Sequence, residues 1–393
     1  MTSIITDPDA LSALCQRIRN APRIAIDTEF HNERSYTARL MVVQIAFEDE
    51  IVLIDPIALP NLTPLAEALQ HTTVVGHALS GDLRIFAERF GVLPSRIFDT
   101  QIAAAFCGYG LSISLLDLVQ SITGIRLQKS QTVSDWSARP LTQRQLEYLV
   151  DDVAHLFALH DALQKKLEAN QRLAWADAEM DALSQLSTFT ADPQRLYLRL
   201  NGTSRLNRRD LGIVRELAAL RDRIARDKDV PSKYIFSDDV LMSIMSVRPS
   251  QIEELSQLRR LEPSARKAYG AEIVAAIQRA SDLPEYELPP RITRMVPLNR
   301  DGIVTLLSVV AAAIAAEHDL PTALLAPRAA LDRVARDLPK DHEEMSVALE
   351  LSEWRVALLA DRLLDLLAGR TALCITDTKN ETPRVVTVSQ FPL

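Results

Sequence analysis

The chain has 393 residues, of which 47% are hydrophobic and 24% charged, and its formal net charge is −8. These values are typical of a globular protein of two or three domains, and they exclude a uniformly basic protein that coats nucleic acid. Cys15, Cys107 and Cys374 are too far apart for a disulfide framework or a zinc site, so a cytoplasmic location is expected. The amino terminus does not resemble a signal peptide, and the longest apolar stretch, 305–316, is shorter than the roughly 20 residues of a membrane span.

The first 170 residues alternate between strand-like and helix-like patterns. After several short helices, the spacing predicts one long helix from Thr142 to about Leu167, with a capping box formed by Thr142 and Gln145. The acidic run at 48–50 predicts a tight hairpin between two strands. We therefore expect an α/β domain with a mixed sheet. Strands are expected at 23–28, 40–47, 51–54 and 72–76, and short helices at 62–69, 82–90, 100–106 and 114–122.

Residues 171–370 lack strand patterns and contain an internal repeat at an offset of 90 residues. Asp229 recurs as Asp319 and Pro231 as Pro321, within matching helical patterns. We interpret these segments as two related helical modules, with chance similarity of amphipathic helices as the alternative. A proline-containing stretch, 283–297, separates the modules.

A basic stretch runs from Arg195 to Lys233 and contains eleven Lys and Arg against five Asp and Glu. Such a stretch can guide a polyanion even on an acidic protein, although a solvated helix face is the alternative interpretation. The last residues, 372–391, contain two β-like runs around a polar segment, which predicts a terminal β-hairpin.

Acidic residues in three separate segments indicate the chemistry. Asp27 and Glu29 are two apart on a predicted strand, so both side chains project from one face. Asp82 begins a predicted helix, where its alternative role is to interact with the helix dipole. Tyr148 is one helical turn from Asp152, but the neighbouring acid at 151 can also face the same way, and spacing alone does not choose between the two.

If these carboxylates were clustered, their negative charges would repel one another unless protons or cations neutralised them. Hard divalent metals such as Mg²⁺ and Mn²⁺ prefer carboxylate oxygen and water. Two metals about 4 Å apart can activate water and stabilise the departing oxygen at phosphorus. The sequence has no P-loop, no dinucleotide fingerprint and no nucleophile elbow, so metal-assisted hydrolysis of a phosphodiester is the favoured hypothesis.

The same segments resemble the ribonuclease D family of DEDD exonucleases. The resemblance is carried by Ile26-Asp27-Thr28-Glu29-Phe30, by 77–83, by Tyr148-x-x-x-Asp152 and by the preceding stretch 135–141. It implies an α/β ribonuclease H-like (DnaQ-like) exonuclease domain with a mixed sheet, followed by two all-α HRDC-type domains. The implied boundaries are 1–195 for the exonuclease domain, 205–285 and 295–370 for the helical domains, and 371–393 for the tail.

The family pattern implies roles for individual residues. Asp27, Glu29, Asp82 and Asp152 would be the metal ligands, and Tyr148 would position the attacking water. The family spacing selects Asp152 over Asp151. Phe30 is a candidate for stacking on the terminal base, and His77, Lys129 and Arg139 are further candidate substrate contacts. For these last four residues, packing or solvated loop positions are the alternatives.

The resemblance implies a 3′→5′ exoribonuclease that uses two divalent ions, Mg²⁺ or Mn²⁺, and releases nucleoside 5′-monophosphates. The implied partner is RNA with a single-stranded 3′ end, tRNA precursors in particular, with no membrane and no obligatory protein partner. One alternative is a DNA 3′→5′ exonuclease. Another is a non-catalytic RNA-binding scaffold, which the presence of all four acids and the tyrosine disfavours.

Overall fold

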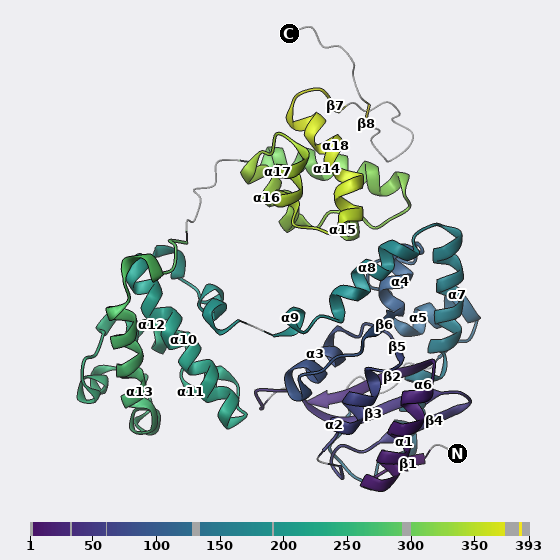
Figure 1. The fold of residues 1–393 in the computed structure, drawn as a ribbon, viewed down its shortest axis with the longest axis horizontal. Coiled ribbons are helices and arrows are strands. Elements are labelled where there is room, and N and C mark those ends of the chain that lie inside the picture. The colour runs from purple at the N-terminus through teal and green to yellow at the C-terminus, as the bar shows by residue number, and fades with distance from the viewer. Residues whose placement is uncertain are drawn as a thin grey trace.

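The computed structural model describes residues 3–31, 34–59, 61–127, 134–190, 192–292, 300–373 and 385–386. An amino-terminal α/β domain is followed by two groups of helices (Figure 1). Within these ranges no helix combines the length and the apolar character needed to cross a membrane.

The α/β domain contains a six-stranded mixed sheet with the order β1-β4-β3-β2-β5-β6. The central strands β2 (Arg23–His31), β3 (Arg39–Phe47) and β4 (Glu50–Ile54) are antiparallel. The outer strands β1 (Ser3–Ile5), β5 (Thr73–Gly76) and β6 (Arg96–Asp99) run parallel to their neighbours. The mixed sheet is confirmed, although neither β1 nor β6 is among the four strands expected from the sequence.

The hairpin between β3 and β4 is also confirmed. Phe47 pairs with Glu50, and Glu48 adopts a positive φ of 53° within the turn. The turn brings β3 and β4 into register beside β2, so the three antiparallel strands form the centre of the sheet.

Helices cover both faces of the sheet, because successive side chains on a strand point to opposite sides. On β2, Ile24 and Ile26 pack into the core beneath α1, α2 and α3, whereas Ala25 packs on the other side. The first group comprises α1 (Pro8–Asn20), α2 (Thr63–Leu69) and α3 (Ser80–Phe90). The second comprises α4 (Thr100–Phe106), α5 (Leu115–Thr123), α6 (Gln143–Ala154) and α7 (Leu156–Ala169).

The capping box of Thr142 and Gln145 is confirmed, but the prediction of one long helix is wrong. The helix is interrupted at His155, which separates α6 from α7. The apolar spacing continues through the interruption, since Val153 and Leu156 are both buried. Periodicity therefore does not reveal the break, which lets α6 pack on β3 and α7 on α4 and α5.

After α7, the chain continues through α8 (Leu173–Leu183) and α9 (Leu186–Phe189) into the helical region. We name α10–α13 module 1 and α14–α18 module 2. Module 1 consists of α10 (Arg208–Lys228), α11 (Ser232–Ile235), α12 (Asp238–Val247) and α13 (Pro263–Asp282). Module 2 consists of α14 (Asp301–Glu317), α15 (Thr322–Leu325), α16 (Arg328–Asp337), α17 (His342–Leu349) and α18 (Glu353–Leu367).

Short 3₁₀ helices connect these elements, at Pro193–Arg199, Thr203–Arg205, Ile252–Gln257 and Glu285–Glu287. The repeated turn is visible in the backbone, because Asp229 and Asp319 both adopt a φ of 48° just beyond α10 and α14. Near the end of the chain, β7 (Ala372–Leu373) pairs antiparallel with β8 (Val385–Val386). The residues between these two strands lie outside the described ranges.

Candidate active site

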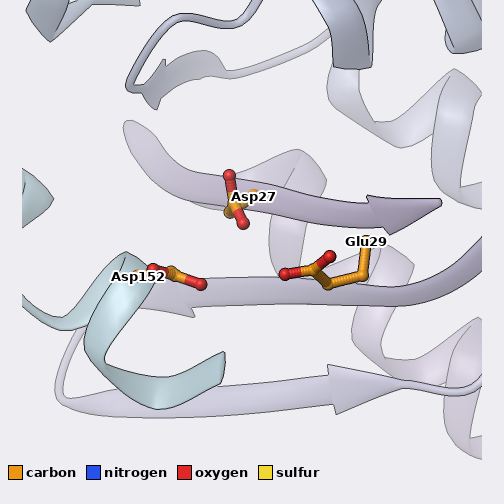
Figure 2. A group of neighbouring side chains, drawn as sticks. All are labelled: Asp27, Glu29 and Asp152. Atoms are coloured by element: carbon orange, nitrogen blue, oxygen red, sulfur yellow. The ribbon is translucent and has the colours of Figure 1, made fainter. Parts of the chain in front are cut away.

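Strand β2 and helix α6 bring three acidic side chains together. Asp27 and Glu29 project from the same face of β2, and Asp152 approaches them from α6 (Figure 2). One carboxylate oxygen from each residue lies within 4.8 Å of the corresponding oxygen of the other two. Among the described residues Asp152, and not Asp151, completes this group.

Burial and the nearby negative charges raise the pKa values of these three carboxyl groups. Removal from water, followed by the charge of Asp82, raises the pKa of Glu29 to about 7. Removal from water, followed by the charge of Glu29, raises the pKa of Asp152 to about 8. The pKa of Asp27 is also raised well above its ordinary range by burial and then by the charges of Asp82, Asp152 and Glu29. A divalent cation would replace these protons, because metal ligands bind in their deprotonated form.

Two further observations fit a cation at this position. Oδ2 of Asp152 is buried and accepts no hydrogen bond from the described residues. The side-chain amide of Gln44, on β3 directly opposite Asp27, is likewise buried without a hydrogen-bond partner in the described part of the chain. A donor set made only of carboxylate oxygens matches hard cations such as Mg²⁺ or Mn²⁺. These residues therefore fit a divalent metal.

Asp82 lies at the edge of this group and does not belong to it. It is buried in the first turn of α3, and its carboxylate accepts a hydrogen bond from the hydroxyl of Thr28. Burial is the main reason that the pKa of Asp82 rises to about 6, and the Thr28 hydrogen bond partly opposes that rise. Thr28 points to the opposite face of β2 from Asp27 and Glu29, so its hydrogen bond holds one carboxylate oxygen of Asp82 on that side, while the charge of Asp82 still raises the pKa of both Asp27 and Glu29.

Tyr148 is half-buried beside the acids, one helical turn before Asp152. Burial raises the pKa of Tyr148, and the charges of Asp152, Glu29 and Asp27 raise it further. The hydroxyl therefore keeps its proton at neutral pH and is able to donate a hydrogen bond. Its ring lies 5.7 Å from the ring of Trp136, measured between centroids.

The candidate substrate contacts have different environments. The half-buried ring of Phe30 lies over Gly81, with Cζ 3.6 Å from the position that a β-carbon would occupy there. His77 uses both ring nitrogens within the protein, with Nδ1 2.9 Å from the hydroxyl of Thr100 and Nε2 3.0 Å from the carbonyl of Ile113. These contacts favour a structural role for His77. Phe30 keeps a partly accessible ring beside the acids.

Arg139 and Lys129 are the other two candidate substrate contacts. The guanidinium of Arg139 makes two hydrogen bonds to Asp55, of 2.6 and 2.8 Å, and further bonds to backbone carbonyls. These bonds favour a structural role for Arg139, because its donors already have acceptors within the protein. Lys129 lies outside the described residues.

Sequence reasoning missed Thr28 and Gln44, which contact or face the acidic residues from neighbouring positions. The alternation of a strand was the available signal, since Thr28 lies between the two acids of β2. Asp99, at the end of β6, supports the site from a neighbouring strand. Its carboxylate caps α4 and accepts hydrogen bonds from the backbone amides of Ala78 and Leu79, which fixes the loop that leads to Asp82.

Comparison with known protein families defines the class of this protein. Residues 2–168 match the family model described as a 3′-5′ exonuclease, and residues 210–277 match the HRDC domain. The first match contains β2, α3 and α6, which carry the acids, and the second lies within module 1. The molecule is therefore a 3′→5′ exonuclease with an attached HRDC domain.

Similarity over nearly the whole chain defines the family more closely. The ribonuclease D of Gluconacetobacter diazotrophicus is 36% identical over 381 residues, which cover 96% of this chain and 95% of that protein. The ribonuclease D of Escherichia coli is 32% identical over 368 residues, or 93% and 98% of the two chains. The crystal structure of Escherichia coli RNase D matches with a TM-score of 0.80 and 30% identity over 94% of this chain and 99% of that one. The chain belongs to the ribonuclease D family of metal-dependent 3′→5′ exoribonucleases.

Proposed function

We propose that this exoribonuclease removes nucleotides from the 3′ ends of RNA precursors, tRNA precursors in particular, with two divalent cations, Mg²⁺ or Mn²⁺. The observation that carries the proposal is the convergence of Asp27, Glu29 and Asp152 on one point. Escherichia coli RNase D, which matches this chain over most of its length, is described as an exoribonuclease involved in structured RNA processing. That description supports an RNA substrate and disfavours the DNA alternative.

The acids would hold the cations and Tyr148 would hold the attacking water. Asp27, Glu29 and Asp152 would provide the first set of oxygen ligands, with Asp82 completing the site from α3. When bound, divalent cations supply positive charge that activates water and stabilises the departing oxygen of an in-line displacement. The neutral Tyr148 hydroxyl, beside Asp152, would orient that water toward the terminal phosphodiester. The product would be a nucleoside 5′-monophosphate.

Phe30 is the best supported of the proposed substrate contacts. A terminal base could stack on its half-exposed ring, and base–aromatic stacking contributes about 1–3 kcal/mol without selecting a base. The contacts proposed for His77, Lys129 and Arg139 remain predictions, and the protein partners of His77 and Arg139 argue against them.

The helical modules are proposed to hold the body of the RNA. Module 2, residues 295–370, is proposed to be a second HRDC-like domain on the basis of its repeat relation to module 1. Within the basic stretch, Arg208 and Arg209 donate to backbone carbonyls at Leu288, Ala280 and neighbouring residues. Arg215, Arg221, Arg223 and Arg226 also donate to acceptors within the protein. The proposed RNA contacts of the stretch therefore fall on its remaining basic residues.

Product analysis on a 3′-labelled tRNA precursor tests the function, with Mg²⁺, with Mn²⁺ and with a chelator. We expect metal-dependent release of nucleoside 5′-monophosphates, and slower degradation of a DNA oligonucleotide of the same sequence. Faster degradation of DNA would support the alternative substrate, and no trimming with either metal would support the scaffold hypothesis.

Adjacent acids on α6 provide a matched pair of variants. Asp152→Asn should abolish trimming, because it removes a member of the carboxylate group, whereas Asp151→Asn should retain it. Equal activity of the two variants would contradict the assignment of the site. Both substitutions remove one negative charge from the same helix, so a general charge effect would alter them alike.

A further inference from the structure

The guanidinium of Arg139 holds a loop against the edge of the active site. It donates to both carboxylate oxygens of Asp55, at 2.6 and 2.8 Å, and to the carbonyl of Met41 on β3 at 2.7 Å. It also donates to the carbonyls of Trp136 and Ala138 within its own loop, at 2.8 and 2.9 Å. One planar side chain thereby fastens the loop to the sheet.

The Asp55 side chain is 9% exposed and that of Arg139 is 26% exposed, so water competes only weakly for their hydrogen bonds. Burial alone would raise the pKa of Asp55, but hydrogen bonds from Arg139 and from the backbone amide of Ile57 lower it below its ordinary value. Asp55 is therefore ionised at neutral pH. The pair has the bidentate geometry that favours arginine over lysine.

The loop that Arg139 holds places Trp136 against Tyr148. Trp136 is 5% exposed and packs in a small cluster with Met41, Leu53 and Leu149, against which Tyr148 also packs. The rings of Trp136 and Tyr148 are 5.7 Å apart and inclined at 33°. Tyr148 is only half-buried, so this contact limits the positions that its ring can take.

We propose that Trp136, fixed by the Arg139–Asp55 ion pair, is a positioning residue that sets the place of the Tyr148 hydroxyl beside Asp152. The inference rests on the proposed function of Tyr148 in orienting water. A hydroxyl that orients an attacking water must be held closely, because a misplacement of about 1 Å can lower a rate by roughly 10²-fold. The ion pair, 84 residues apart in the chain, joins β4 to the loop before α6 and so sets the position of Trp136.

A double-mutant cycle between Trp136 and Tyr148 tests this inference through kcat and KM on a single-stranded RNA oligonucleotide. Trp136→Ala should lower kcat by about 10²-fold with a KM that stays within about twofold of the wild-type value. Tyr148→Phe should lower kcat by about 10²–10⁴-fold. The double variant should be no slower than Tyr148→Phe, because Trp136 has no further effect once the hydroxyl is gone. Trp136→Phe, which keeps an aromatic ring, should restore most of the activity.

Arg139→Lys tests the ion pair, and Arg23→Lys is its matched control. Arg23 also pairs with a carboxylate, with Nη2 3.0 Å from Oδ2 of Asp161, and packs on Phe157 away from Trp136. We expect Arg139→Lys to lower kcat by about tenfold, since lysine cannot reproduce the bidentate contacts. Arg23→Lys should leave kcat unchanged. Thermal unfolding of each variant identifies the temperature range in which all of them are folded, and the kinetics are measured there.

Multiplicative losses in the double variant would show that Trp136 acts independently of the Tyr148 hydroxyl, and equal losses for Arg139→Lys and Arg23→Lys would show that the Arg139–Asp55 pair has no particular effect on catalysis. Either result would overturn the proposal. Failure of the proposed function gives a different result. In that case Asp152→Asn and Tyr148→Phe keep wild-type activity, whatever the effect of Trp136→Ala.

Discussion

The two helical modules share a repeat but attach to the exonuclease domain by different means. The two modules are separate groups of helices (Figure 1). Module 2 belongs to the same hydrophobic core as α4, α7 and α8, whereas module 1 has a core of its own, against which Tyr36 packs. At the module 2 contact, the ring of Trp354 stacks on Trp175 at 5.1 Å and meets Phe106 edge-on at 5.3 Å. Apolar burial therefore holds module 2, and mainly polar contacts hold module 1.

The module 1 contact centres on Tyr36, between β2 and β3. Its hydroxyl donates to Asp222 at 2.7 Å and accepts from Arg226 at 3.2 Å, and its backbone amide donates to Asp229 at 3.1 Å. Arg39 adds an exposed ion pair to Asp229. Exposed ion pairs contribute little stability, so this contact is weaker than the shared core of module 2.

The two modules contact the exonuclease domain at equivalent turns but through helices of different composition. Asp229 and its counterpart Asp319 each contact the exonuclease domain, Asp229 through Tyr36 and Asp319 through its carbonyl, which accepts from Arg172 at 3.5 Å. The helices before these turns differ in composition, since α10 is rich in arginine and α14 is rich in alanine, valine and leucine. The two modules therefore have similar backbones but different surfaces. The arginine-rich surface of module 1 makes polar contacts with the exonuclease domain, and the apolar surface of module 2 is buried against it.

Among the tests of these two attachments, replacement of Trp354 should cause the largest loss of stability. Trp354→Ala should lower the free energy of unfolding by about 3–5 kcal/mol, because it removes a buried aromatic ring from the shared core. Denaturant unfolding followed by circular dichroism measures the change. Trp354→Phe is the control and should cost much less. A loss of under about 1 kcal/mol for the alanine variant would mean that module 2 is not held by this core.

Removal of the Glu179 carboxylate should have the next largest effect. Glu179 on α8 accepts from the hydroxyl of Ser352 and the indole of Trp354, each at 2.9 Å, and pairs with Arg355 at 2.8 Å. Glu179→Ala should lower the free energy of unfolding by about 3 kcal/mol, because the largely buried Arg355 then lacks its partner. The same denaturant titration measures it. Glu168→Ala, at an exposed position on α7, is the control, and equal losses would contradict this role.

Divalent metal should stabilise the exonuclease domain together with module 2, and not module 1. At a metal concentration of 100 times Kd, the expected gain is about 2.7 kcal/mol. Differential scanning calorimetry with Mg²⁺ or a chelator should show the shift in the transition that includes module 2. Asp152→Asn should remove most of the gain. A metal shift confined to a transition of module 1 would contradict the comparison.

The same transition should depend on pH when metal is absent. Glu29 and Asp152 have pKa values raised to about 7 and about 8, so the folded protein binds more protons than the unfolded chain above about pH 4. Stability should therefore fall as pH rises from about 4 to 8 in the chelated protein. Saturating Mg²⁺ should flatten this dependence, and an identical slope with and without metal would count against binding at these acids.

Removal of the Tyr36 hydroxyl should have the smallest effect and should act locally. Tyr36→Phe should cost about 0.5–1.5 kcal/mol, because it removes the hydrogen bonds to Asp222 and Arg226. Hydrogen exchange should increase at the contact between α10 and the exonuclease domain, with little change in module 2. Tyr234→Phe, at a residue that is 59% exposed, is the control. Faster exchange in module 2 would show that the two attachments are coupled.

Much of the site followed from local spacing. The alternation of a strand put Asp27 and Glu29 on one face, and the capping box at Thr142 marked where α6 begins. The resemblance selected Asp152, which the structure groups with the strand acids. The three-residue strand β1 and the break at His155 were missed, because one is too short for a pattern and the other does not interrupt the apolar spacing.

The sequence by itself determined which acids share a face and that two modules repeat, because backbone geometry fixes the periods of strands and helices. Only the tertiary structure decided that Asp82 turns to Thr28, that Arg139 binds Asp55, and that one module shares the exonuclease core. These outcomes depend on partners far apart in the chain, which the packing of whole elements brings together and which local spacing does not specify.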